Sequence, residues 1–263
     1  MDGMAQQRSM KRDAILGRVT VITAIYNAAP TLRRCIESVL AQEHLDTEYI
    51  LMDGGSTDGS IDILKSYGNR IFWRSERDRG IYDAWNKSLA MATGEWIAFL
   101  GADDFYLPGA LNAYMQVANM SEAEYISSLV RYVKSSGKSE IIGESWSWPR
   151  FQSHMTTAHV GSMHRYSLFE KYGMYDISYR IVGDYELLLR PRDSLCAAFL
   201  PQITVEMQAG GTSDSFAALR EARIAKTTTG GREVFLSYLD LVIAYAKLTG
   251  RRLLARSMSL GTR

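Results

Sequence analysis

The chain has 263 residues, 46% of them hydrophobic, which is enough for one sizeable core and a terminal appendage. The formal net charge of +1 excludes the global basic field that would favour binding to nucleic acid, so we expect no nucleic-acid partner.

The two cysteines, Cys35 and Cys196, lie far apart without a CxxC spacing, which argues against a disulfide framework and a zinc site. Residues 1–18 form a polar leader without the apolar run of a signal peptide. No stretch approaches the roughly 18 apolar residues of a membrane span. We therefore expect a cytoplasmic protein.

Strands and helices alternate in the first part of the chain. Short apolar segments predict buried strands at 19–25, 48–52, 71–73 and 96–100. Apolar residues at helical spacing predict helices at 31–42, 60–67 and 80–92. This alternation predicts an α/β fold with a mainly parallel central sheet flanked by helices.

The later pattern is less regular. It predicts strands at 125–133 and 138–142, and short helices at 167–172 and 185–190. From Phe216 onward helix dominates, and one apolar stripe precedes a tail with basic but no acidic residues. The stripe contains Phe235, Leu236, Leu239, Val242, Ile243 and Ala246, and the basic residues are Lys247, Arg251, Arg252, Arg256 and Arg263.

Acidic residues follow two of the predicted strands. Asp53 opens a glycine-rich turn over 53–59, and Asp103 and Asp104 follow the fourth strand. Ligands bind at the carboxyl ends of strands in such sheets, so we expect both loops at one crevice. Adjacent carboxylates suit Mg²⁺ or Mn²⁺ carried by a diphosphate. Each aspartate, and Asp184 at a helix start, also has an ordinary interpretation as a turn or helix-capping residue.

Four ordered blocks carry a family resemblance: VTVITAIYN at 19–27, LMDGGSTDG at 51–59, DRGIYDAWNK at 78–87 and ATGEWIAFLGADD at 92–104. Together they resemble glycosyltransferase family 2, which has the GT-A fold, and especially members that build bacterial cell-surface polysaccharides and glycolipids. The resemblance implies a catalytic domain over 19–215 and a C-terminal helical extension over 216–263.

The resemblance also implies an activity and a donor site. The chain would be a metal-dependent, inverting enzyme that moves a sugar from a nucleoside-diphosphate sugar, typically UDP-linked, to a hydroxyl of a saccharide or lipid-linked acceptor. The implied roles are Thr23, Ala24 and Tyr26 lining the nucleotide, Asp53 on the base, Asp83, Asn86 and Lys87 bordering the donor sugar and diphosphate, Asp103 at the ribose or sugar, and Asp104 on Mn²⁺ or Mg²⁺.

One position departs from the family pattern, because Gly101 stands where many relatives have an acidic or small polar residue. The family's catalytic base lies downstream, and the segment IVGDYELLLR at 181–190 resembles that block. It assigns Asp184 as the base, with Glu186 as the competing candidate. We expect Asp53, Asp104 and Asp184 to surround one cavity.

Several alternatives stay open. The C-terminal stripe either lies on an anionic membrane surface, at the inner face of the cell membrane, or packs on the catalytic domain. His154, His159 and His164 invite a metal interpretation, but their five-residue spacing puts them on no single helical face. The resemblance gives a role near the acceptor or diphosphate to His159 alone.

Other functions are also compatible with such a sheet. A catalytically silent nucleotide-binding partner remains an alternative. A sugar nucleotidyltransferase would need a glycine-rich basic loop, which residues 24–28 lack. The lack of a GxGxxG after the first strand argues against a dehydrogenase.

Overall fold

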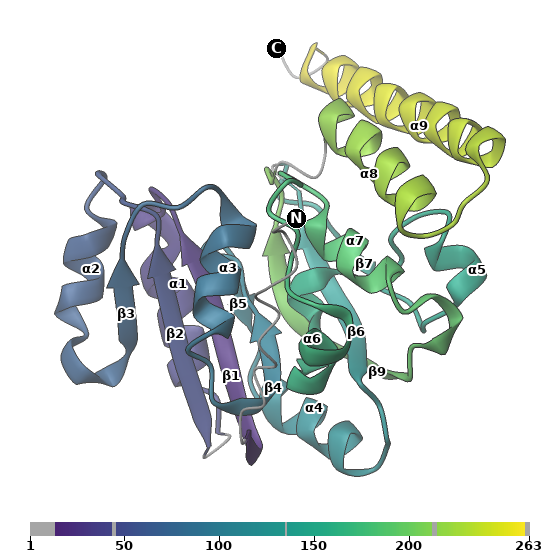
Figure 1. Ribbon diagram of the computed structural model, residues 1–263. Coiled ribbons are helices and arrows are strands. Elements are labelled where there is room, and N and C mark those ends of the chain that lie inside the picture. Colours follow the sequence, from purple (N-terminus) through teal and green to yellow (C-terminus); the bar gives the residue numbers. More distant parts are fainter. Residues whose placement is uncertain (1–13, 44–45, 135, 212–214, 261–263) are drawn as a thin grey trace, which may run out of the picture.

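The computed structural model describes residues 14–43, 46–134, 136–211 and 215–260, with residues 251–260 described by their backbone alone. The described residues form a nine-stranded sheet of order β3-β2-β1-β4-β8-β6-β9-β5, with β7 paired to β6 (Figure 1). The strands are β1 (Ile15–Ile25), β2 (Thr47–Asp53), β3 (Phe72–Ser75), β4 (Gly94–Phe99), β5 (Phe105–Tyr106), β6 (Tyr125–Val133), β7 (Ser139–Ile142), β8 (Ser162–Arg165) and β9 (Ala197–Gln208).

The sheet is parallel in its first half and mixed in its second. β1 pairs in parallel with both β2 and β4, and β2 pairs in parallel with β3. β8 then runs antiparallel between β4 and β6, and β9 runs parallel to β6. The α/β architecture expected from the sequence is confirmed, with antiparallel strands added at the β8 side.

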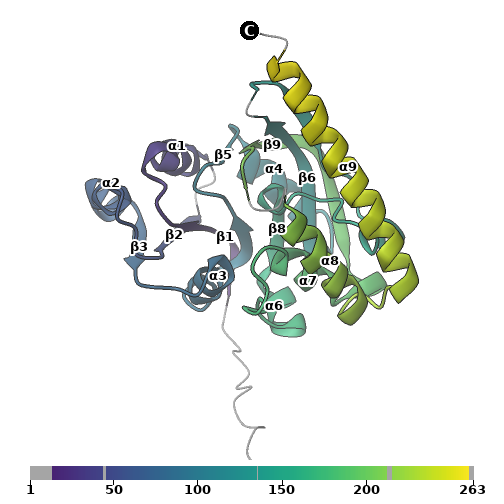
Figure 2. The ribbon, with the colours of Figure 1, turned by 90° about the horizontal axis from the view of Figure 1, so that it is seen from above.

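Helices cover both faces of the sheet (Figure 2). One core contains α1, α2 and α4 with Val21 and Trp96, and the other contains α3, α6 and α7 with Ile22 and Phe99. The alternation along β1 and β4 reflects the two-residue period of a strand. The helices are α1 (Ala29–Leu40), α2 (Ser60–Ser66), α3 (Ile81–Leu89), α4 (Ala110–Asn119), α5 (Trp148–Phe151), α6 (Tyr166–Tyr172), α7 (Gly183–Leu189), α8 (Phe216–Thr228) and α9 (Val234–Leu260).

Among the described helices and strands, α4, α5, β5, β8 and β9 were not predicted. Helix α4 has a usable signal, since its buried Leu111, Met115 and Ala118 recur at helical spacing. Strand β9 is harder to recognise because it contains Pro201, which cannot donate to a ladder. Leu200 pairs with Ser128 and Ile203 pairs with Leu129, so the intervening residues form a bulge.

Helices α8 and α9 form the C-terminal extension and lie beside each other at one end of the molecule (Figure 1). Asp240 of α9 accepts hydrogen bonds from Arg232 Nε and Nη2, each at 3.1 Å, and its carboxylate lies 3.6 Å from Lys226 Nζ. Helix α9 therefore packs against α8 and the loop between the two helices, within the extension. Its outer face still exposes Phe235 and Val242, at 71% and 64%.

Parts of the expected domain scheme lie beyond the described residues. Strand β1 begins at Ile15, so residues 15–18 of the expected leader belong to the sheet, while residues 1–13 are outside the described part. The basic side chains expected at Arg251, Arg252, Arg256 and Arg263 are also outside it. Within the described residues, no helix has the length and apolar character required to cross a membrane.

Candidate active site

A hollow of about 1050 Å³ opens at the carboxyl ends of β1, β2 and β4. This is the edge at which open α/β sheets bind ligands. The loops after all three strands contribute, together with the segment before α3. The lining residues are Ala24, Ile25, Tyr26, Asn27, Ala28, Pro30, Thr31, Gly54, Gly55, Thr57, Arg77, Asp78, Gly80, Ile81, Gly101, Ala102 and Asp103. We call it the donor hollow, after the sugar-donor site that the sequence predicts at this edge.

Hydrogen bonds join the first two loops of the donor hollow. The Asn27 N–H donates to Ser56 Oγ at 2.8 Å, and Asn27 Oδ1 accepts from the Thr57 N–H at 2.9 Å. The Ala29 N–H donates to Asp58 Oδ2 at 2.9 Å. Asn27 adopts a φ of 51°, a left-handed conformation that asparagine tolerates better than most residues. The β1 and β2 loops are thereby fixed relative to each other.

Asp53 lies behind the donor hollow and is fully buried. Its Oδ2 accepts from the N–H groups of Gly55 and Ser56 at 3.0 and 3.1 Å, and from Ser75 Oγ at 2.7 Å. Its Oδ1 is buried without a hydrogen-bond partner among the described residues. One oxygen therefore shapes the loop, and the other has an unused acceptor capacity.

Asp103 and Asp104 differ in their surroundings. Asp103 is exposed and lines the donor hollow, whereas Asp104 is 5% exposed and lies behind it. Asp104 Oδ1 accepts from the Gln208 N–H of β9 at 2.9 Å. Burial, followed by the negative charge of Asp103, raises the pKa of Asp104 to about 7. A divalent cation at this pair would offset that charge.

Gly101 makes this arrangement possible. A Cβ atom at this position would lie 2.4 Å from Asp104 Oδ2 and 3.0 Å from Asp103 Oδ1. Both carboxylates therefore fold back over the glycine. The departure from the family pattern at Gly101 provides the space that Asp104 occupies.

Other predicted donor-site residues lie behind the lining. Thr23 is buried and its Oγ1 lies 3.2 Å from the Tyr49 hydroxyl. Asp83 accepts from the Arg79 N–H, and Lys87 bonds to Glu76 at 3.0 Å. Asn86 exchanges two hydrogen bonds with the Tyr175 backbone. Of the donor-side residues, Ala24, Tyr26 and Asp103 line the hollow, whereas Thr23, Asp83, Asn86 and Lys87 do not.

Asp184 lies in the first turn of α7. Its Oδ1 accepts from the Tyr82 hydroxyl at 3.2 Å. Burial raises the pKa of Asp184 to about 6, although backbone and Tyr82 hydrogen bonds act in the opposite direction. A carboxyl group with such a pKa can take and release a proton near neutral pH.

The expectation of one shared cavity is wrong. Asp184 lines a second hollow of about 540 Å³, and the first turn of α3 lies between the two. Gly80 and Ile81 face the donor hollow while Tyr82 contacts Asp184. Nearby, Arg180 Nη1 donates to the Arg79 carbonyl at 2.6 Å and joins the two loops.

Glu221 was not anticipated. From α8 its carboxylate accepts from three consecutive N–H groups, those of residues 180, 181 and 182, at 2.8, 2.7 and 2.9 Å. This anchors the backbone that leads into α7 and Asp184. A lone glutamate on a helix gives no sequence signal for this contact, because its partners are backbone groups 39 to 41 residues away.

The competing base candidate has structural partners. Glu186 is 5% exposed, pairs with Arg190 and accepts from Thr229 Oγ1 at 2.9 Å. His159 and His164 are buried with ring centroids 5.2 Å apart, and burial lowers the pKa of both. Among the described residues, no group of three histidine, cysteine or acidic side chains could hold a metal.

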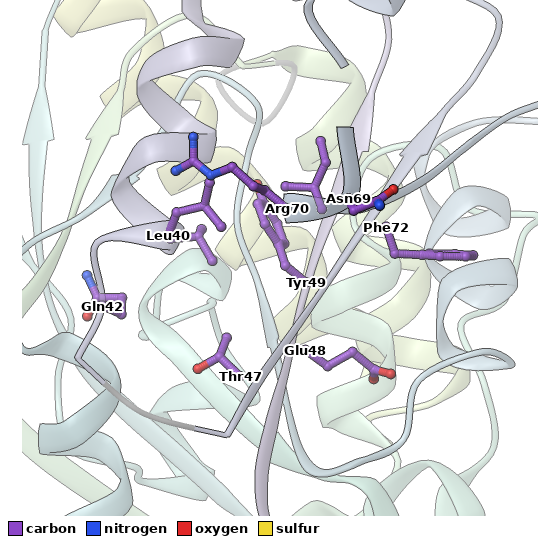
Figure 3. A pocket seen from close by; sticks show the side chains of 10 residues that line it. Leu40, Gln42, Thr47, Glu48, Tyr49, Asn69, Arg70 and Phe72 are labelled. Atoms are coloured by element: carbon purple, nitrogen blue, oxygen red, sulfur yellow. The ribbon is translucent and has the colours of Figure 1, made fainter. Parts of the chain in front are cut away.

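A third hollow, of about 500 Å³, lies near the amino end of β2 (Figure 3). Thr47, Glu48 and Arg70 are among its lining residues. Glu48 is occupied there by hydrogen bonds from Thr20 and Thr93. This third hollow lies at the amino ends of the parallel strands, whereas ligands in this type of sheet bind at the carboxyl ends.

Comparison with known proteins gives consistent results. The protein-family model described as Glycosyl transferase family 2 matches residues 20–176, which is more than half of the chain. A PGL/p-HBAD biosynthesis glycosyltransferase of Mycobacterium tuberculosis is 27% identical over 188 residues, covering 65% of this chain and 68% of the relative.

Two solved structures share the fold. Staphylococcus aureus TarS in complex with UDP-GlcNAc has a TM-score of 0.66 at 14% identity, covering 85% of this chain and 70% of that chain. The mannosyltransferase PcManGT of Pyrobaculum calidifontis, in complex with GDP-Man and Mn²⁺, has a TM-score of 0.62 at 16% identity, covering 94% and 81%.

The position of Asp104 gives a testable prediction. Gly101→Ala should displace the Asp104 carboxylate from Gln208, because the new Cβ would overlap with it. We expect faster hydrogen exchange at the Gln208 amide and a loss of about 1 kcal/mol in the free energy of unfolding. Gly250→Ala is the control, since a Cβ there meets nothing within 4 Å. Unchanged exchange at Gln208 in Gly101→Ala would contradict the arrangement.

Proposed function

Because this chain belongs to glycosyltransferase family 2 and has the GT-A fold, we propose that it moves a sugar from a nucleoside-diphosphate sugar to an acceptor hydroxyl with inversion of configuration. The observation that carries the proposal is the pairing of a loop-built hollow at the carboxyl edge with a carboxylate of raised pKa across α3. The nucleotide we propose is uridine diphosphate.

The donor hollow supports the nucleotide assignment. It is large enough for a nucleotide, and the aromatic side chain of Tyr26 is 69% exposed on its wall. TarS was solved with UDP-GlcNAc, and the mannosyltransferase with GDP-Man. Asp53 Oδ1 would accept the N–H of uracil, which gives a partner to a buried acceptor that has none. Its full burial requires the 54–56 loop to shift for this contact.

Asp104 fits a divalent cation. Mg²⁺ and Mn²⁺ are often held by one or two carboxylates with phosphate oxygens completing the shell, so the Asp104 carboxylate suffices here. Bound Mn²⁺ or Mg²⁺ would offset the negative charge that develops on the departing diphosphate. Asp104 would be the ligand, Asp103 would face the ribose or sugar, and Gln208 would orient Asp104 through its N–H.

Asp184 is the proposed general base. It would take the proton from the acceptor hydroxyl as that oxygen forms a bond to the anomeric carbon. The bond from the anomeric carbon to the diphosphate oxygen breaks on the opposite face, and the electron pair leaves with the nucleoside diphosphate. Tyr82 would hold the carboxylate in place through its 3.2 Å hydrogen bond. Asp83, Asn86, Lys87 and Thr23 would act by supporting the walls.

The reaction requires the two hollows to communicate. The hydrogen bond from Arg180 to the Arg79 carbonyl is solvent-exposed, so water can compete for it. Opening it would free the 79–82 segment between donor and acceptor. Donor binding at Gly80 and Ile81 is the event that we propose to displace this segment.

We propose a saccharide or lipid-linked acceptor and attachment to the inner face of the cell membrane. The described part of α9 exposes a row of apolar side chains at helical spacing, including Phe235, Tyr238, Leu239 and Val242. Amphipathic helices with such faces bind in the interfacial region of a bilayer.

A catalytically silent partner and a sugar nucleotidyltransferase are the alternatives that the following experiments also test.

Asp184→Asn should reduce release of UDP from a panel of UDP-sugars in the presence of acceptor by about 10²–10⁴-fold. Binding of UDP with Mn²⁺, measured by calorimetry, should be unchanged, because Asp184 does not line the donor hollow. Glu186→Gln is the matched control and should retain transfer. Full turnover in Asp184→Asn removes the base assignment, and no UDP binding by the unmodified protein removes the proposed donor.

The pH dependence should report the pKa of Asp184. The base works when deprotonated, so kcat/KM should fall below about pH 6. Tyr82→Phe removes a hydrogen bond that favours the charged form, and should therefore move this limb to higher pH. If the acidic limb of the kcat/KM profile stays at the same pH in Tyr82→Phe, the titration belongs to another group.

Membrane attachment predicts that the protein floats with vesicles of phosphatidylcholine and anionic phosphatidylglycerol. The double substitution Phe235→Glu and Val242→Glu should abolish flotation, since it places charge on the apolar face. Met120→Glu is the control, an exposed apolar residue at the end of α4. Equal flotation of all variants, or none of the unmodified protein, rules out this role for α9.

A further inference from the structure

The second hollow is built mainly by the C-terminal extension. It lies between α7, α8, α9 and the 153–155 segment, and its volume of about 540 Å³ is in the range of small-molecule sites. The lining is largely apolar. Its residues are Ser153, His154, Met155, Ile181, Val182, Asp184, Tyr185, Ala218, Leu219, Ala222, Lys226, Asp240, Ile243, Ala244 and Lys247. We call it the α9 cavity.

The charged side chains at the α9 cavity differ in how their charges are compensated. Lys226 is 7% exposed and its charge is compensated by Asp240, which also binds Arg232. Asp184 is bonded instead to the hydroxyl of Tyr82, a neutral donor. The carboxylate of Asp184 is therefore a hydrogen-bond acceptor in a largely apolar wall, and it has remaining capacity for a hydroxyl.

The cavity is continuous with the apolar surface of α9. Ile243 lines the cavity and is also 54% exposed, next to Val242 on the outer face of the helix. Ile243 thus connects the apolar outer surface of α9 with the lining of the cavity.

We propose that the α9 cavity binds the apolar body of an amphiphilic acceptor and presents its hydroxyl to Asp184. This deepens the proposed function, on which it rests, by naming the acceptor class. A sugar alone gains little from the apolar part of the lining, which includes Met155, Leu219 and Ala222, and a hydroxyl placed there without a partner is costly to bury. An alkyl or aryl group gains from the same burial.

The test uses n-octyl β-D-glucoside below its micellar concentration, with glucose as the comparison. Ala244→Trp fills the cavity from α9, and Ala246→Trp places the same side chain on the exposed face two residues away. Ala222→Trp and Ala217→Trp form a second pair on α8, because Ala222 lines the cavity and Ala217 is exposed. Thermal unfolding verifies that each variant is folded.

We expect octyl glucoside, but not glucose, to bind the unmodified protein, Ala246→Trp and Ala217→Trp. Its affinity should fall at least about tenfold in whichever of Ala244→Trp and Ala222→Trp is folded. Equal affinity for a folded cavity variant and its control, or absence of binding to the unmodified protein, overturns the proposal. Calorimetry with UDP and Mn²⁺ is a separate readout: its failure would remove the donor while leaving the cavity result intact.

Discussion

The site depends on carboxylates that are buried at the carboxyl edge of a parallel sheet and held there by backbone N–H groups. Burying a charge is costly unless hydrogen bonds or an ion compensate it. Asp53 is compensated by Gly55, Ser56 and Ser75, whereas Asp104 has the Gln208 N–H and a raised pKa. Asp53 therefore organises its loop through hydrogen bonds and needs no ion. At Asp104, by contrast, a bound cation would compensate the buried negative charge.

The C-terminal extension contributes directly to the surroundings of Asp184. Glu221 of α8 anchors the backbone before Asp184, and α9 closes the cavity that Asp184 faces. Acceptor chemistry and membrane attachment would then share one pair of helices. The hollow built from the loops after β1, β2 and β4 is connected to the extension through Arg180, whose N–H is held by Glu221 and whose guanidinium bonds to the Arg79 carbonyl.

The sequence predicted the first half of the fold well because local and tertiary signals agree there. Buried parallel strands are continuous apolar runs, and α1 has a clear apolar face. β9 was missed because Pro201 interrupts its pattern, and only pairing with β6 makes the segment a strand. β5 and β8 are short and gain their identity from β9 and β4 in the same way.

For the site, the sequence by itself determined which residue types follow each strand, because strand direction sends each loop to the carboxyl edge. Ala24, Tyr26 and Asp103, three of the predicted donor-site residues, line the hollow, and their roles stay a prediction. Only the tertiary structure decided which side chains face inward, and Thr23 and Asn86 bond instead to Tyr49 and Tyr175. It also separated Asp184 from the donor hollow by α3 and joined it to Tyr82 and Glu221. Contacts between distant segments depend on tertiary packing, which the local sequence pattern does not specify.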